Sequence, residues 1–308
     1  MSDAAPEKPL RGILLMVGAV TVFTVMSAFI KAADRVPAGQ AMFFRSVFAL
    51  PFVLSFLAAR GELRTGVQVR RLKAHLVRGL AGACAMGLGF AGLRYLPLPD
   101  VTAIRFVTPV MMVILAALIL GERVRLIRIS AVAVGLLGVL IIVWPRLTLG
   151  SESDLLGVAM ILASAFLAAF AQIMVKAMSG TETTASIVFW FSVIATLASL
   201  LTIPFGWVWP TPQEAALLIG AGVIGGAGQM MLTSSYRFAD AGVLAPFTYV
   251  SMLWSIVIGL VWFDEVPTAW TLLGAALVIG AGVAIVLRER ALGIEATARR
   301  KVRAKAWQ

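Results

Sequence analysis

Ten apolar stretches, each about 20 residues long, occupy most of this 308-residue chain. A helix of about 20 apolar residues spans the hydrocarbon core of a bilayer and satisfies its own backbone polar groups. We therefore predict an all-α integral membrane protein with ten transmembrane helices. The predicted spans are residues 12–33, 38–59, 76–96, 99–120, 126–145, 155–177, 186–206, 213–235, 242–263 and 268–287.

The composition agrees with solvation by lipid. Only 13% of the residues are charged, whereas a soluble domain carries about 25%. The first apolar run is too long for the hydrophobic core of a signal peptide, so we expect it to remain as a span. A single cysteine, Cys84, and a single histidine, His75, argue against a disulfide framework and a clustered metal site. We expect no cofactor.

The formal net charge of +11 is concentrated in the predicted connections at residues 60–78 and 121–128 and in a basic tail, residues 288–308. An excess of lysine and arginine marks the cytoplasmic side of a membrane protein. We therefore predict a multi-pass protein of the bacterial inner membrane with both termini in the cytoplasm. This placement argues against nucleic acid as a partner. The tail either contacts anionic lipid or is a solvated signal that holds the C-terminus inside.

The chain repeats itself. Landmarks recur at offsets of 143 to 145 residues: Leu93-Arg94-Tyr95 with Tyr236-Arg237-Phe238, Glu122 with Glu265, Gly138 with Gly282, and Lys31 with Lys176. Each half has five spans, an odd number, so the second half enters the membrane upside down relative to the first. Inverted repeats of this kind form a substrate cavity at their interface. We predict a first repeat at residues 12–146, a second at 154–287, and the tail at 288–308.

Three landmarks of the first half resemble the signature of the EamA family, in the drug/metabolite transporter superfamily: Pro109 early in the fourth span, Gly121-Glu122-Arg123 at its end, and Gly135 and Gly138 in the fifth span. The second half carries a looser copy: Pro246, Asp264-Glu265-Val266, Gly274, Gly280 and Gly282. The resemblance covers residues 12–287. It implies ten helices around a central cavity and transport of a small metabolite; bacterial amino-acid exporters belong to this family.

Arg45 and Arg105 are the two charges that lie deep within predicted spans. An arginine in hydrocarbon is costly and usually faces the interior of the bundle or water. Its planar guanidinium binds a carboxylate through two parallel hydrogen bonds. Each side chain is therefore a candidate for substrate binding, and snorkelling to the headgroups is the alternative. For Arg45, where the family often has arginine, a structural role is favoured.

Six further side chains are expected to line the cavity: Thr102, Thr108, Gln172, Gln229, Tyr249 and Trp254. The alternative for these residues is hydrogen bonding or packing between helices. Pro109 frees the carbonyl group of Arg105 from its helical bond, which either opens a polar notch beside the guanidinium or only kinks the helix.

Charged residues at the ends of spans have simpler interpretations. We expect Asp100 to cap the start of the fourth span and Lys31 to snorkel to the surface. Glu122 and Glu265 either cap or pair locally, or act as gate residues that pair with a basic neighbour in one state.

The chain contains no phosphate-binding loop, and its spans contain no nucleophile–base pair, so neither ATP hydrolysis nor catalysis is expected. We predict a secondary transporter that works by alternating access, most simply an exporter of an amino acid or a related metabolite. Uptake of a vitamin or a nucleoside-like metabolite is the alternative. The partners expected are a small-molecule substrate and lipid, for a monomer or a weak homo-oligomer.

Overall fold

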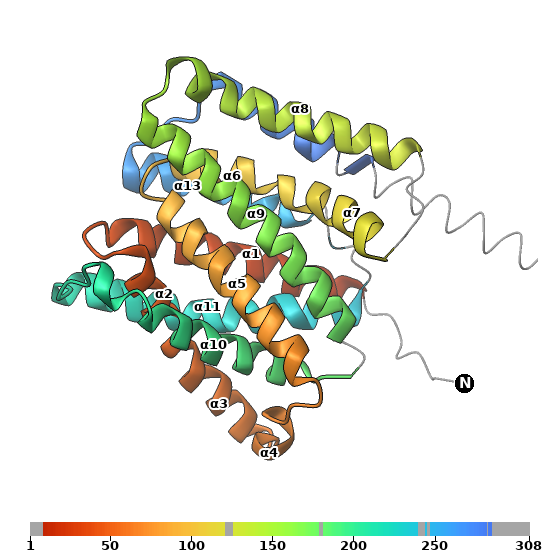
Figure 1. Ribbon diagram of the computed structural model, residues 1–308, viewed down its shortest axis with the longest axis vertical. Helices are drawn as coiled ribbons and strands as arrows, with labels where there is room; N and C mark the ends of the chain where they lie inside the picture. The colour runs from red at the N-terminus through yellow and green to blue at the C-terminus, as the bar shows by residue number, and fades with distance from the viewer. Residues whose placement is uncertain are drawn as a thin grey trace, which may run out of the picture.

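The computed structural model describes residues 9–120, 126–178, 181–239, 244, 247–281 and 283–284. Every regular element in these ranges is helical, and they contain no strand (Figure 1). Among them, five helices are long and apolar enough to cross a membrane, and four shorter apolar helices accompany them. The prediction of an all-α membrane protein is confirmed. Glu122, Pro246 and the predicted tail at 288–308 lie outside the described residues.

The helices of the first half are α1 (Pro9–Ala32), α2 (Ala38–Val47), α3 (Ala49–Ala59), α4 (Leu63–Gly66), α5 (Leu72–Gly92), α6 (Leu98–Arg105), α7 (Val107–Leu120) and α8 (Leu126–Leu149). Those of the second half are α9 (Glu152–Met178), α10 (Thr184–Leu200), the short η1 (Ile203–Phe205), α11 (Pro212–Phe238) and α13 (Val250–Phe263). A further apolar helix covers Ala269–Ala281.

Two predicted spans are interrupted rather than continuous. The span at 38–59 consists of α2 and α3, which are separated at Phe48, and the span at 99–120 consists of α6 and α7, which are separated at Phe106. A proline follows each interruption within a few residues, Pro51 and Pro109. Proline has no N–H to donate to the carbonyl four residues earlier, and its ring clashes with that carbonyl. The interruptions follow from these prolines.

Several predicted boundaries are wrong. The third span starts at Leu72, not at residue 76, so the basic segment before residue 78 is partly helical. The fifth continues to Leu149 through Pro145. The seventh ends at Leu200 instead of residue 206, because the chain turns through η1 to Gly206, whose positive φ of 89° suits glycine.

The two halves pack against each other along long helices. α1 lies along α11, α5 lies along α9, and α10 packs on α2 and α5; α5 and α9 run side by side across the middle of Figure 1. The largest buried apolar cluster draws on both halves, including Met42, Phe90, Ile161 and Met252. Most of the core therefore belongs to the interface between the halves.

The bundle has two distinguishable ends. We call the end with the connections at 33–37, 93–97, 201–211 and 264–268 the Lys31 end. Gln40 ties two of these connections together through paired hydrogen bonds to the backbone of Val208, at 2.7 and 3.0 Å. The opposite end, with the connections at 60–71 and 181–183, is called the His75 end.

Candidate functional site

Two arginines lie buried inside the bundle against one aromatic ring. Arg45 in α2 is 3% exposed and Arg78 in α5 is 5% exposed. Their guanidinium carbons lie 5.3 and 4.0 Å from the centroid of the Phe191 ring in α10. The ring faces of aromatic residues attract cations, so Phe191 holds both guanidinium groups in one place.

Neither of these arginines is paired with an acid. The Nε and Nη1 atoms of both Arg45 and Arg78 have no hydrogen-bond partner, and the nearest polar contact is a long one, 3.5 Å from Arg45 Nη2 to the carbonyl oxygen of Gly225. No ion pair joins them to a carboxylate within the described residues. A charged side chain at the centre of a membrane helix costs about 3 kcal/mol even on the mildest scale. Buried guanidinium groups with unused donors are able to bind an anion.

Arg105 is the last residue of α6 and lies immediately before the interruption at Phe106. Its guanidinium lies directly over Gly89 of α5, where a Cβ atom would collide with Nη2, and beside the Ser164 hydroxyl of α9. Ser164 donates its own hydrogen bond to the carbonyl oxygen of Ala85, at 2.6 Å. Among the described residues, none forms an ion pair with Arg105. Gly89 therefore provides the space that the third interior arginine occupies.

The two threonines predicted near Arg105 bond within their own helices. The Thr102 hydroxyl donates to the carbonyl oxygen of Leu98 at 2.9 Å, and the Thr108 hydroxyl donates to that of Arg105 at 2.7 Å. The carbonyl that Pro109 releases is thus taken by Thr108. The structure favours the kink over an open notch at this point.

The other predicted cavity residues are distributed over three helices. The ring of Tyr249, at the start of α13, meets the ring of Phe106 edge to face at 5.0 Å, so α13 touches the interruption beside Arg105. Gln172 in α9 and Gln229 in α11 are half-buried, and Trp254 in α13 is 39% exposed. Contact of these four side chains with a substrate stays a prediction.

A buried carboxylate organises the His75 end. Glu182 accepts hydrogen bonds from the backbone N–H groups of Arg70 and Arg71 at 2.9 and 2.8 Å, and its second oxygen lies 3.5 Å from His75 Nε2. Burial favours the neutral acid, but these N–H groups and the imidazole outweigh it and lower the pKa of Glu182 below its usual value.

Two predictions about residues at this end are wrong. His75 and Arg78 were expected in a cytoplasmic loop, and both lie in α5, nearly fully buried. The sequence interpretation missed Arg78, Phe191 and Glu182 as functional candidates. An earlier start of the third span, at Leu72, would have placed Arg78 well inside it.

At the Lys31 end, one ion pair joins three helices. Lys31 Nζ lies 2.6 Å from Glu265 Oε1 and donates to the carbonyl oxygen of Leu96 at 2.8 Å. The other carboxylate oxygen of Glu265 accepts from the N–H of Leu98 at 2.8 Å, at the start of α6. The prediction that Lys31 snorkels is therefore wrong. Glu265 caps the start of α6 and pairs with a basic residue that is distant in sequence; its role as a gate stays a prediction.

Asp100 does not cap α6. Its carboxylate binds Arg146 Nη2 at 2.9 Å and accepts from the Thr271 hydroxyl at 2.6 Å. Arg146 also binds Asp154, at 3.1 Å. Since Glu265 already supplies the cap, Asp100 is free to join α6 to α8 and to the helix at Ala269–Ala281.

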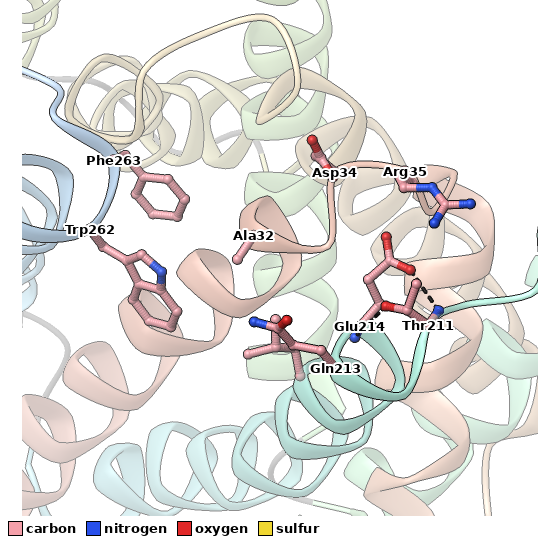
Figure 2. Close-up of a pocket in the computed structure, with 9 residues that line it drawn as sticks. Ala32, Asp34, Arg35, Thr211, Gln213, Glu214, Trp262 and Phe263 are labelled. Carbon is pink, nitrogen blue, oxygen red and sulfur yellow. Dashed lines mark hydrogen bonds between the residues drawn. The ribbon is translucent and has the colours of Figure 1, made fainter.

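A pocket of about 440 Å³ opens at the Lys31 end of the bundle (Figure 2). Its residues are Ala32, Asp34, Arg35, Thr211, Gln213, Glu214, Leu217, Trp262 and Phe263. In Figure 2 the rings of Trp262 and Phe263 form one wall and the polar side chains form the other. Lys31 Nζ lies 5.5 Å from the Phe263 ring centroid, so the ion pair lies next to the aromatic wall. Among the described residues, no group of side chains is arranged to hold a metal ion.

The comparisons with known proteins agree on one family. The model of the EamA-like transporter family matches residues 10–144 and again residues 155–288. The pseudopaline exporter of Pseudomonas aeruginosa is 33% identical over 281 residues, which cover 89% of this chain and 95% of the exporter. A riboflavin transporter of Rhizobium johnstonii is 30% identical and covers 92% of this chain and 93% of its own length.

More distant relatives include an S-adenosylmethionine uptake transporter of Rickettsia prowazekii, which is 27% identical over 80% of this chain and 81% of its own length. One solved crystal structure superposes with a TM-score of 0.67 and 18% sequence identity, over 91% of this chain and 98% of the other. At this identity the match shows a shared fold.

Proposed function

The chain belongs to the EamA-like transporter family, and from this premise we propose that it exports a small metabolite with a carboxylate group, such as an amino acid or a related compound. One observation carries the proposal: the guanidinium groups of Arg45 and Arg78 are buried with donors that bind nothing. A guanidinium fork matches a carboxylate. The pseudopaline exporter among the relatives supports export.

We further propose that ten spans form two inverted repeats, at 12–146 and 154–287, around a central cavity. The packing supports this arrangement. α1 lies along α11 while α9 lies along α5, so the first span of each half packs on the third span of the other. Such an exchange is what a two-fold axis in the membrane plane produces.

Transport in this proposal occurs by alternating access. With both termini in the cytoplasm, the Lys31 end faces outward, and the Lys31–Glu265 pair keeps that end closed in this state. The interruptions at Phe48 and Phe106 support the proposal, because broken helices commonly build the substrate site of secondary transporters.

Uptake of a vitamin or nucleoside-like metabolite is the second candidate. It is favoured by the identity of 30% with a riboflavin transporter and by the rings of Trp262 and Phe263 in the pocket at the Lys31 end. Flat aromatic ligands stack on such rings.

Counterflow in proteoliposomes distinguishes the candidates. The panel contains amino acids, organic acids, nucleosides and vitamins, and wild type is compared with Arg78→Ala and Arg105→Ala. We expect exchange of carboxylate-bearing solutes and at least a tenfold loss in Arg78→Ala. The matched control is Arg60→Ala, because Arg60 also stacks on a phenylalanine ring, Phe56, but is exposed. Exchange confined to nucleosides or vitamins, at equal rates in Arg78→Ala, would replace the first candidate with the second.

A further inference from the structure

We infer that the substrate carries two anionic groups, one bound between Arg45 and Arg78 and the other bound at Arg105. This inference rests on the proposed function, which requires only one carboxylate. It adds a substrate class: elongated metabolites with an acid group at each end, such as dicarboxylates or acidic conjugates of amino acids.

The two positive sites lie at different heights along α5. Gly82 packs against the Phe191 ring, and a Cβ atom there would lie 3.7 Å from Arg78 Nη1; Gly89 packs against the Arg105 guanidinium. Gly82 and Gly89 are seven residues apart, nearly two helical turns, so they lie on one face of α5 and about 10 Å apart along its axis. The guanidinium groups therefore form two separate sites on the same helix face.

The surface of α5 between these two sites is uncharged. The face of α5 between them carries only uncharged residues, Ala85 and Met86, between Gly82 and Gly89. The Ala85 carbonyl is already bonded to Ser164, which leaves no free acceptor there to attract a cation. An elongated molecule with an uncharged middle suits a surface that is polar only at its two ends.

The positive charges of the three arginines need negative counter-charges. The described part of the chain provides no carboxylate for any of the three arginines. One carboxylate would leave the other site without a counter-charge, which is unfavourable both at the buried Arg45 and Arg78 and at the half-buried Arg105. A substrate with an acid at each end places one carboxylate at each site and compensates two of the three positive charges.

Equilibrium binding to the purified full-length protein in detergent tests the inference without requiring transport. The probes are radiolabelled succinate, pimelate and sebacate, together with the monomethyl ester of sebacate. Succinate is too short to reach both sites, whereas sebacate is long enough. We expect sebacate to bind at least tenfold more tightly than succinate and than its own monoester.

The variants assign the two ends. Arg78→Ala and Arg105→Ala should each weaken sebacate binding at least tenfold and reduce it to the affinity of the monoester. Arg60→Ala should leave binding unchanged. Arg78→Lys keeps the charge without the fork, and it serves as the test if Arg78→Ala does not fold; it should bind with intermediate affinity.

Equal affinity for sebacate and its monoester, or absence of binding at every length, would overturn the inference. So would a loss of affinity in Arg105→Ala alone. Counterflow separates this result from the proposed function. Exchange of amino acids with one carboxylate and without preference for diacids would keep the transporter and remove the second anionic group. Tight sebacate binding without exchange of any solute would do the opposite.

Discussion

At the scale of single residues, surroundings decide what an arginine does. Arg60 and Arg78 both lie over phenylalanine rings, at 4.5 and 4.0 Å from the centroids. Arg60 is exposed at the end of α3, where water solvates its charge, whereas Arg78 is 5% exposed and has unused donors. The same contact is a surface interaction in one place and part of the proposed anion site in the other.

Glu182 carries a residue-scale prediction about pH. Its pKa is lowered in the folded protein, so its ionised form stabilises the fold at pH values above the unfolded carboxyl pKa of about 4.3. That contribution is lost as the pH falls through the lower, folded pKa. Thermal unfolding in detergent should therefore lose stability over this acidic range in wild type. Glu182→Gln should be less stable at neutral pH by about 1–2 kcal/mol.

The pH profile provides the control for this prediction. Glu182→Gln should show a smaller decline below pH 5 than wild type, by about the stability that it already lacks at neutral pH. Glu62→Gln, at an exposed glutamate in the connection 60–71 of the same end, should follow the wild-type profile. Identical acid profiles for wild type and Glu182→Gln would mean that this carboxylate does not stabilise the His75 end.

A functional charge can be recognised from the sequence when its neighbours in the chain are apolar. Arg45 and Arg105 are flanked by apolar residues, so they are visible as charges within spans. Arg78 follows a run of basic residues, so it was counted with the basic connection at 60–78 although the predicted span starts at residue 76. The pairing of Lys31 with Glu265 joins residues 234 positions apart, and no local pattern predicts it.

At the scale of elements, the helices were predictable and their interruptions only partly so. The lengths of the apolar segments predict the spans, because in lipid the backbone N–H and C=O groups can form hydrogen bonds only with each other. Pro109 predicted a kink in the fourth span, and the structure has an interruption there. Asp100 was expected to cap α6, but the cap comes from Glu265, far along the chain. Side chains from distant helices decide such details.

The helix at Ala269–Ala281 packs closely against α8, and glycine at position 274 makes this possible. A Cβ atom on Gly274 would meet the backbone oxygen of Gly138 and would lie 3.0 Å from the backbone nitrogen of Ile142. Backbone atoms cannot turn aside, so Gly274→Val should force apart α8 and the helix at Ala269–Ala281. Overpacking of this kind costs about 1–3 kcal/mol. We expect a lower midpoint of thermal unfolding in detergent.

A second glycine of the same helix is the control. Gly280 has no heavy atom within 4 Å of its Cβ position, so Gly280→Val should unfold at nearly the wild-type temperature. An equal loss of stability in both variants would attribute the effect to valine in the helix rather than to the contact with Gly138.

At the scale of the whole molecule, the proposed transport mechanism depends on the interior cations and on a closed Lys31 end. The interior cations belong to α2, α5 and α6, and the ion pair at the Lys31 end belongs to α1 and the connection after α13. We propose that a solute held by the arginines leaves at that end only when the pair separates and the Lys31 end opens.

The distance across this ion pair reports whether the Lys31 end opens. Spin labels are placed at Arg35→Cys and Val266→Cys, two exposed positions on either side of the pair, with Cys84, an exposed free cysteine, replaced by alanine. Glu265→Gln is added because an amide still accepts the N–H of Leu98 but carries no charge for Lys31. Pulsed electron–electron double resonance in nanodiscs should give a short distance between the two labels in the parent protein. Glu265→Gln should show a larger population of longer distances. A single distance distribution, identical in both proteins, would contradict a Lys31 end that opens when this pair breaks.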